Sequence, residues 1–340
     1  MAKTIFEKKN VLVIGGAGFI GSHLCDELVK TSKVICLDNF LTGSEQNIDH
    51  LLENPDFAFI RHDITEPFSL SGEERALQKF KAAWQGVQEV YFLASPSSRS
   101  DVERFPIETM MVNSVGLRYA LDLAKESKAI FCYVSSDATY GQVVNGSGRV
   151  SESAEGIVPH IDNYSAFAVA QRFGEALVES YRRNYGLNVR IARVFSSYGP
   201  RMRLDDSNVV TEFLQNIFKG KEVIIYGGSE AVGSFCYVSD TVKGLIRLMS
   251  AGDEQPVNIG SDQALQLTEL ARMMMTLVEE EVRIMVRPDY PDGYHPRLIP
   301  NITRAKENLS WFPVTLLKDG LAKTVEDLKA GRGLVKLGAS

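Results

Sequence analysis

The sequence has no apolar run near the roughly 20 residues that a membrane-spanning helix needs, and its first residues lack the apolar core of a signal peptide. It contains only four cysteines among 340 residues, none of them spaced Cys-x-x-Cys. A disulfide framework or a thiolate metal site is therefore not expected, and the thiols should be buried and reduced. These absences predict a cytoplasmic protein with no metal site and no membrane partner.

The chain also lacks any block of basic residues. Its formal net charge of −6 is spread along the sequence, whereas a protein that follows a phosphate backbone concentrates Lys and Arg on one face. Nucleic acid is therefore not expected as a partner. No internal repeat is visible, and a hydrophobic content of 44% is ample for a packed core.

One glycine-rich stretch organises the first part of the chain. Val11–Ile14 is wholly apolar, which is typical of a strand buried on both faces. Of the glycines that follow, Gly15 would make a tight turn, Gly18 would let the backbone approach a pyrophosphate, and Gly21 would let a helix lie close to the strand. A phosphate would rest at the N-terminus of that helix. A plain turn also uses glycine, so this stretch alone leaves both interpretations open.

A carboxylate favours the dinucleotide interpretation. Lys33–Asp38 is typical of a second strand that ends in an acid, and Asp38 lies 20 residues after Gly18. This is the spacing of a group that binds ribose hydroxyls. A carboxylate there would repel a 2′-phosphate, so the sequence predicts NAD rather than NADP. The alternative is a solvated strand end.

Strand and helix patterns alternate through much of the chain, which predicts parallel strands joined by right-handed crossovers. Further strands are expected at residues 57–64, 89–95, 130–136 and 189–195, with long helices after the fourth strand and at about 164–184. Beyond residue 200 the segments become shorter. The predicted fold is α/β, with a Rossmann-type doubly wound parallel sheet in residues 1–200 and a smaller α+β substrate lobe in residues 201–340, with some interleaving.

Several short stretches carry a family resemblance. They are Gly15–Gly21, Leu37–Gly43, His62–Ile64, Leu93–Pro96, Tyr198–Met202, Phe235–Val238 and Asn301–Lys306. With these stretches the sequence resembles the extended short-chain dehydrogenases/reductases that act on nucleotide sugars, most closely the UDP-glucuronate decarboxylases. The likeness runs from Asn10 to about Asp327.

The resemblance implies NAD as cofactor, a nucleotide-linked sugar as substrate, and a homodimer packed through the helices after the fourth and fifth strands. It places the cofactor against residues in the glycine turn, at the strand ends and on two helices. These are Gly15, Gly18, Phe19, Ile20, Gly21, Asp38, Asn39, Phe40, Thr42, Gly43, Asp63, Ile64, Leu93, Ala94, Ser95, Asn113 and Gln171.

The sequence departs from the family at the catalytic pair Tyr-x-x-x-Lys. That spacing is one helical turn, so the ammonium lies beneath the phenol and stabilises a phenolate, which takes the alcohol proton. If the following Arg-Phe-Gly-Glu fixes the register, these positions hold Phe167 and Gln171. If Tyr164 is aligned instead, the lysine position is Ala168. The lysine is absent in either register, and Gln171 can bind a ribose hydroxyl but carries no charge.

Other positions of the expected substrate site differ as well. Ala138 replaces a glutamate of the decarboxylases, Ser196 stands where an asparagine binds the substrate, and Gly233 replaces an arginine that grips the diphosphate. Loss of such an arginine removes roughly 1.5 to 3 kcal/mol, or about tenfold to a hundredfold in affinity, unless another cation takes its place. The candidates for that place are Arg201, Arg203 and Arg297, and Tyr226 completes the expected substrate site.

The catalytic candidates are Ser136, Asp137 and Tyr164. Ser136 matches the family's catalytic Ser/Thr, although a serine there can equally orient a ligand. Asp137 can act as an acid or base if it is desolvated, or simply bond the next turn. Tyr164 lies one helical turn before Phe167 and is either catalytic or a core or dimer-face residue. The loop histidines at 160 and 295 show no ligand spacing and are expected to be exposed.

Three functions remain open on the sequence alone. The first is an NAD-dependent enzyme of the decarboxylase, epimerase or dehydratase type with a nonstandard acid/base set. The second is an inactive protein that binds NAD and a nucleotide sugar. A nucleic-acid-binding relative is the third, and the acidic balance disfavours it. The first is favoured because Ser136, Asp137 and Arg201 are all expected at the crevice.

Overall fold

The computed structural model describes residues 8–72, 75–143, 149–159, 165–252, 255–291 and 297–332. The chain divides into two compact units, each assembled from several stretches. Unit 1 comprises residues 1–95, 111–134 and 173–191, and unit 2 comprises 96–110, 135–172 and 192–340. The boundary expected at residue 200 stays a prediction. No described helix is both long enough and apolar enough to cross a membrane.

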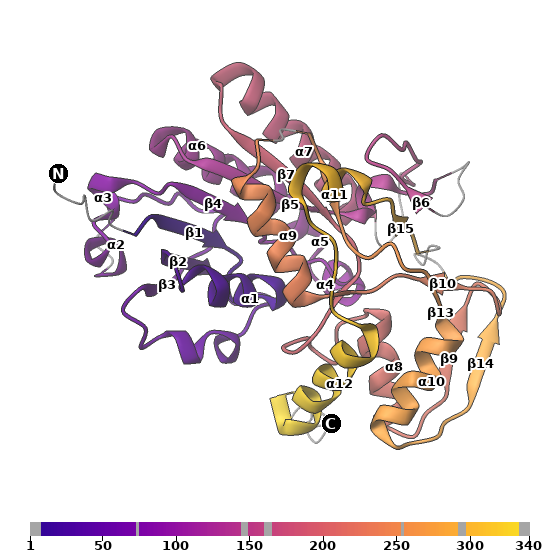
Figure 1. Ribbon diagram of the computed structural model, residues 1–340. Coiled ribbons are helices and arrows are strands. Elements are labelled where there is room, and N and C mark those ends of the chain that lie inside the picture. The colour runs from indigo at the N-terminus through magenta and orange to yellow at the C-terminus, as the bar shows by residue number, and fades with distance from the viewer. Residues whose placement is uncertain are drawn as a thin grey trace. The chain divides into compact units, whose positions relative to one another are not determined.

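A parallel sheet of seven strands has the order β12-β7-β5-β4-β1-β2-β3, which confirms the Rossmann-type prediction. Figure 1 labels all of these strands except β12. Its strands are β1 (Asn10–Ile14), β2 (Lys33–Asp38), β3 (Phe57–Arg61), β4 (Glu89–Phe92), β5 (Ile130–Ser136), β7 (Val189–Val194) and β12 (Val257–Ile259). The third and fourth strands end earlier than expected. The residues after their ends, such as Asp63 and Ser95, therefore lie in loops, where backbone groups can face a ligand.

Strand β1 is fully buried, as its apolar run predicts. Leu12 pairs with Ile35 on one side and Val90 on the other, and Ile14 pairs with Leu37 and Phe92. Because side chains alternate across a strand, these residues share one face. They form the centre of the unit 1 core, and burying each such side chain stabilises the fold by about 1.5 to 3 kcal/mol.

The helices of unit 1 connect these strands. They are α1 (Phe19–Leu28), the short turns η1 (Glu45–Asn47) and η2 (Asp49–Leu51), α2 (Arg75–Lys79), α3 (Ala82–Gln85) and α6 (Leu117–Ser127). The single long helix expected after the fourth strand is instead α5 (Pro106–Met111), a π-helical turn η3 (Val112–Gly116) and then α6. Such π turns often lie at functional positions, and this one carries Asn113. Helix α7 (Ser165–Tyr185) has residues in both units.

Unit 2 has the short, mixed segments that the sequence predicts. Its helices are α4 (Arg99–Arg104), η4 (Asp137–Tyr140), α8 (Val209–Phe218), α9 (Val238–Ser250), α10 (Leu267–Val278), α11 (Thr303–Leu309), α12 (Leu317–Asp327) and η5 (Leu328–Arg332). Its strand pairs are β6 (Arg149–Val150) with β15 (Ile299–Pro300), β8 (Ser197–Tyr198) with β11 (Cys236–Tyr237), β9 (Val223–Tyr226) with β14 (Ile284–Arg287), and β10 (Val232–Gly233) with β13 (Leu265–Gln266). Helix α10 lies against β9 and α8 (Figure 1).

Candidate active site

The glycine turn of unit 1 has no room for side chains. Gly15 has a φ of +84°, and a Cβ there would lie 2.6 Å from the Ala94 nitrogen. A Cβ on Gly21 would lie 2.1 Å from the Gly15 carbonyl oxygen. Gly18 precedes α1 as its N-cap residue. Bare backbone therefore surrounds the N-terminus of α1, which is the arrangement that receives a pyrophosphate.

Asp38 closes this turn at the end of β2. Its Oδ2 accepts the Ala17 N–H at 2.9 Å and its Oδ1 accepts the Phe40 N–H at 2.8 Å. Burial raises the pKa of Asp38, and these backbone hydrogen bonds oppose the rise. Gly43 packs here as well, since a Cβ on it would lie 3.1 Å from Asp38 Oδ1. Each carboxylate oxygen keeps acceptor capacity for a ribose hydroxyl.

A second carboxylate, Asp63, follows β3. It accepts hydrogen bonds from the Asn39 amide at 3.0 Å and from the Thr65 N–H at 2.9 Å. Burial alone would raise the pKa of Asp63, but the bonds from Thr65 and Asn39 outweigh it and lower the pKa. Phe40 has a φ of +63° and stacks on Phe59 with ring centroids 4.9 Å apart. The loops after β2 and β3 are thus tied together where an adenosine is expected.

A buried polar chain supports the loop after β4. The Asn113 amide donates to Ser95 Oγ at 2.9 Å, and the Tyr133 hydroxyl donates to Asn113 Oδ1 at 2.9 Å. Tyr133 was not predicted from the sequence as a site residue, because its alternation with Phe131 in β5 indicates only a core residue. A Cβ on Gly174 would lie 2.2 Å from the Tyr133 hydroxyl oxygen.

Taken by itself, unit 1 fits NAD. It holds every predicted cofactor residue except Gln171, which lies in unit 2. The glycine turn presents backbone without side chains at the start of α1, and Asp38 ends β2 with the carboxylate expected to bind the ribose. Leu93 and Ala94 bring bare backbone to Gly15, and Phe19 and Ile20 form the first turn of α1. The assignment of these residues to NAD stays a prediction.

The catalytic candidates in unit 2 start with a serine and an aspartate at the carboxyl end of β5. Ser136 Oγ donates to Asp137 Oδ1 at 2.9 Å and accepts the Ala138 N–H at 3.2 Å. Burial raises the pKa of Asp137, while the Ser136 hydrogen bond and the charge of Arg297 oppose the rise. Tyr164 and the two loop histidines at 160 and 295 lie outside the described residues.

Arg172, which in the sequence marks only the register of the Arg-Phe-Gly-Glu stretch, holds this turn in place. Its Nε donates to the Thr139 carbonyl at 2.7 Å and its Nη2 donates to the Gly156 carbonyl at 2.7 Å. Phe167 and Gln171 are both buried on the same helix. At positions 167 and 171, where the Tyr-x-x-x-Lys pair is expected, α7 therefore has neither a phenol nor an ammonium.

Arg297 lies beside Gly233, the position where the family resemblance implies that an arginine is missing. A Cβ on Gly233 would lie 3.2 Å from Arg297 Cδ and 2.9 Å from Phe235 Cζ. Arg297 is also the cation that acts on Asp137 and on Tyr290. Within unit 2, Ser136 and Asp137 are therefore hydrogen-bonded to each other, and the charge of Arg297 acts on that carboxylate.

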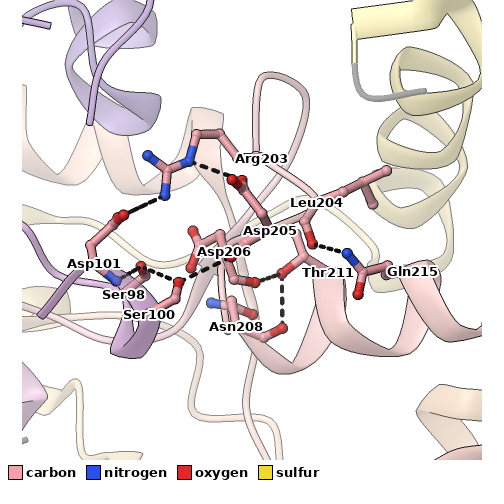
Figure 2. Close-up of polar contacts among 10 residues, drawn as sticks. All are labelled: Ser98, Ser100, Asp101, Arg203, Leu204, Asp205, Asp206, Asn208, Thr211 and Gln215. Atoms are coloured by element: carbon pink, nitrogen blue, oxygen red, sulfur yellow. Dashed lines mark hydrogen bonds and ion pairs between the residues drawn. The ribbon is translucent and has the colours of Figure 1, made fainter. Parts of the chain in front are cut away.

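The other expected substrate residues are placed differently. Arg203 Nη2 donates to both oxygens of Asp101 at 2.7 and 2.8 Å, and Arg203 Nε lies 3.3 Å from Asp205 Oδ1 (Figure 2). These ion pairs compete with any phosphate for the Arg203 charge. Arg201 has a φ of +68°. Its backbone N–H donates to Asp327 Oδ2 at 2.9 Å. Ser196 precedes β8 and Tyr226 ends β9.

Comparisons with known proteins agree with this architecture. Residues 11–260 match the model of the NAD dependent epimerase/dehydratase family. UDP-glucuronic acid decarboxylase 5 of Arabidopsis thaliana is 36% identical over 328 residues, which are 96% of this chain and 91% of that protein. The UDP-glucose 4-epimerase of Thermotoga maritima, solved with UDP-glucose, has a TM-score of 0.79 at 28% identity over 94% of this chain and 99% of its own. The UDP-glucuronic acid 4-epimerase of Bacillus cereus, solved with NAD, has a TM-score of 0.78 at 26% identity with the same coverages.

Proposed function

Because the chain belongs to the NAD-dependent epimerase/dehydratase family, we propose that it is an enzyme that oxidises a nucleotide-linked sugar. NAD is the cofactor of this family, and when bound its nicotinamide supplies the hydride acceptor. In this chain the glycine turn and the N-terminus of α1 bind the pyrophosphate, and Asp38 binds the adenosine ribose. The loop that carries Asp63 and Ile64 lies against the adenine.

The observation that carries the proposed substrate class is the position of Arg297 against Gly233. A guanidinium there replaces the missing diphosphate clamp and can make the charge-assisted bonds that a diphosphate needs. Relatives that resemble this chain along nearly their whole length are named for UDP-glucuronic acid or UDP-glucose. The proposed substrate is therefore a sugar linked to uridine diphosphate or a similar nucleotide, and Ser136 faces its reacting hydroxyl.

A second candidate is a protein that binds NAD and a nucleotide sugar without turnover. The buried Phe167 and Gln171 favour it, because neither can exchange a proton at the position of the family's base. The hydrogen-bonded Ser136 and Asp137 favour the enzyme instead. Enzymatic activity is the proposal because these two groups provide a route for a proton that the family pair no longer supplies.

The proposed assembly is a homodimer. Large apolar side chains are exposed on α5, where Ile107 is 72% and Met110 is 39% accessible. On α7, Val169 and Phe173 are 41% and 48% accessible. Such exposed apolar side chains favour a protein partner, and a second copy of the same chain fits the family resemblance. The proposed compartment is the cytoplasm, because all four cysteines are free and buried.

The test is a binding screen followed by product analysis. The midpoint of thermal unfolding is measured with NAD present and with UDP, UDP-glucose, UDP-glucuronic acid or UDP-N-acetylglucosamine added separately. Any sugar that raises the midpoint is then incubated with the protein and NAD, and the products are analysed by mass spectrometry. We expect binding in the parent and a loss of binding in Arg297→Ala, with Lys30→Ala as an exposed basic control. Absence of binding by every UDP compound would contradict the proposed substrate class.

A further inference from the structure

Ser136 and Asp137 are joined by a hydrogen bond of defined direction. The Ser136 hydroxyl has one proton, and this proton points to Asp137 Oδ1 at 2.9 Å. Of the two acceptor positions on the same oxygen, one receives the Ala138 N–H at 3.2 Å. No described residue donates to the other position, which can accept a hydroxyl from a ligand. In this state Ser136 can accept a proton from the ligand but has none left to donate to it.

The surroundings keep this orientation fixed. Ser136 caps η4 (Asp137–Tyr140), and Arg172 donates to the Thr139 carbonyl of that turn and to the Gly156 carbonyl. Among the described residues, Arg297 is the charged group whose attraction lowers the pKa of Asp137 and so favours the carboxylate over the carboxylic acid. Burial acts in the opposite direction and makes Asp137 a stronger base than an exposed aspartate.

We propose that Asp137, acting through Ser136, replaces the missing Tyr-Lys pair as the base of the oxidation step. This inference rests on the proposed function. In the step, the sugar hydroxyl gives its proton to Ser136 Oγ while the Ser136 proton moves to Asp137 Oδ1. Oxidised nicotinamide, when bound, would accept the hydrogen of the sugar carbon together with its two electrons, and the C–O bond would become C=O. In the reverse step, Asp137 returns the proton by the same route.

This proton relay compensates for the glutamate that the family resemblance implies at position 138, where this chain has alanine. Asp137 supplies a carboxylate at the neighbouring position, and the serine transmits its basicity to the ligand. The forward step requires charged Asp137, so its rate should rise with pH as Asp137 loses its proton. Because burial raises the pKa of Asp137, this rise should lie above the ordinary range of an aspartate near 4.

The first test is independent of turnover. Carboxyl-carbon NMR of protein labelled at aspartate follows the titration of Asp137, with the signal assigned by its loss in Asp137→Asn. Ser136→Ala removes a hydrogen bond to the charged form, so the pKa of Asp137 should rise in that variant. Ser180→Ala, which changes an exposed serine on α7, should leave it unmoved. An unchanged pKa of Asp137 in Ser136→Ala would overturn the relay.

The second test uses any UDP-sugar that the parent binds with NAD. Ser136→Ala and Asp137→Asn should each slow turnover on the order of a hundredfold to ten-thousandfold with NAD affinity unchanged, and the double variant should be no slower than the slower single variant. The exposed Asp49→Asn serves as control. Turnover that survives either change, or a bound sugar that the parent never converts, would overturn the relay. Failure of every UDP compound to bind would instead overturn the proposed function, while the NMR result still decides whether the two groups are coupled.

Discussion

Replacing Asp206 by asparagine is expected to stabilise the protein at neutral and alkaline pH. Asp206 lies in the segment between Pro200 and α8. Polar contacts hold this segment on both sides (Figure 2). On the α8 side the Asp206 carbonyl accepts the Thr211 hydroxyl, and the Gln215 amide donates to the Leu204 carbonyl at 3.1 Å. These bonds involve backbone carbonyls, so the substitution leaves them intact.

The magnitude follows from the pKa of the side chain. Burial raises the pKa of Asp206 from 3.8 to about 6, against the attraction of Arg203 and with the help of Asp101 and Asp205. At about 1.4 kcal/mol per pKa unit, this corresponds to a cost of about 3 kcal/mol for the charged form. The folded protein binds this proton more tightly than the unfolded chain. The cost is therefore absent below about pH 4, develops as the pH rises, and is complete above about pH 6.

The assay is thermal unfolding of the parent and of Asp206→Asn at pH 4.5, 6 and 8. The variant should unfold a few degrees higher at pH 8, since 1 kcal/mol shifts the midpoint by about 2 °C or less in a chain of this size, and the difference should shrink toward pH 4.5. Asp205→Asn is the matched control, because it removes an exposed ion pair with Arg203 and should be neutral or slightly destabilising. A lower midpoint for Asp206→Asn at pH 8 would refute the assigned cost.

Three further predictions concern the site. Asp38→Ala should weaken NAD binding by about 1 to 3 kcal/mol in calorimetry, and the parent should prefer NAD to NADP; tighter NADP binding would contradict this assignment. Gly21→Ala, which puts a Cβ 2.1 Å from the Gly15 oxygen, should abolish NAD binding or folding, whereas Gly252→Ala has open space and should do neither. The parent should convert UDP-glucuronic acid to UDP-xylose slowly at best, because Phe167 and Gln171 replace the base and its cation; rapid product formation would show that the register of that helix is wrong.

Much of the fold could be predicted because its signals are local. The apolar run before Gly15 and the acid at the end of Lys33–Asp38 fix two neighbouring parallel strands, and both strands occur where expected. The interruption of the helix at Val112–Gly116 could not be predicted, because a π turn depends on tertiary packing such as that of Gly116 against Ile64. No periodicity in the sequence indicates it.

The site was less predictable because its contacts join distant residues. On the sequence alone, Arg203 and Arg297 are equal candidates to bind the diphosphate in place of the missing arginine. Only the structure shows that Arg203 is bound to Asp101, 102 positions away, whereas Arg297 lies against Gly233. Similarly, Ser136 and Asp137 are adjacent in sequence, but the direction of the hydrogen bond between them depends on the capped turn that follows β5.

The most direct test of enzymatic activity is the fluorescence of reduced nicotinamide after protein loaded with NAD is mixed with a UDP-sugar that it binds. If the chain oxidises nucleotide-linked sugars, reduced nicotinamide should form in the parent and be nearly absent in Asp137→Asn, although both proteins bind the sugar. A parent protein that binds NAD and the sugar together but forms no reduced nicotinamide and no product would contradict the account.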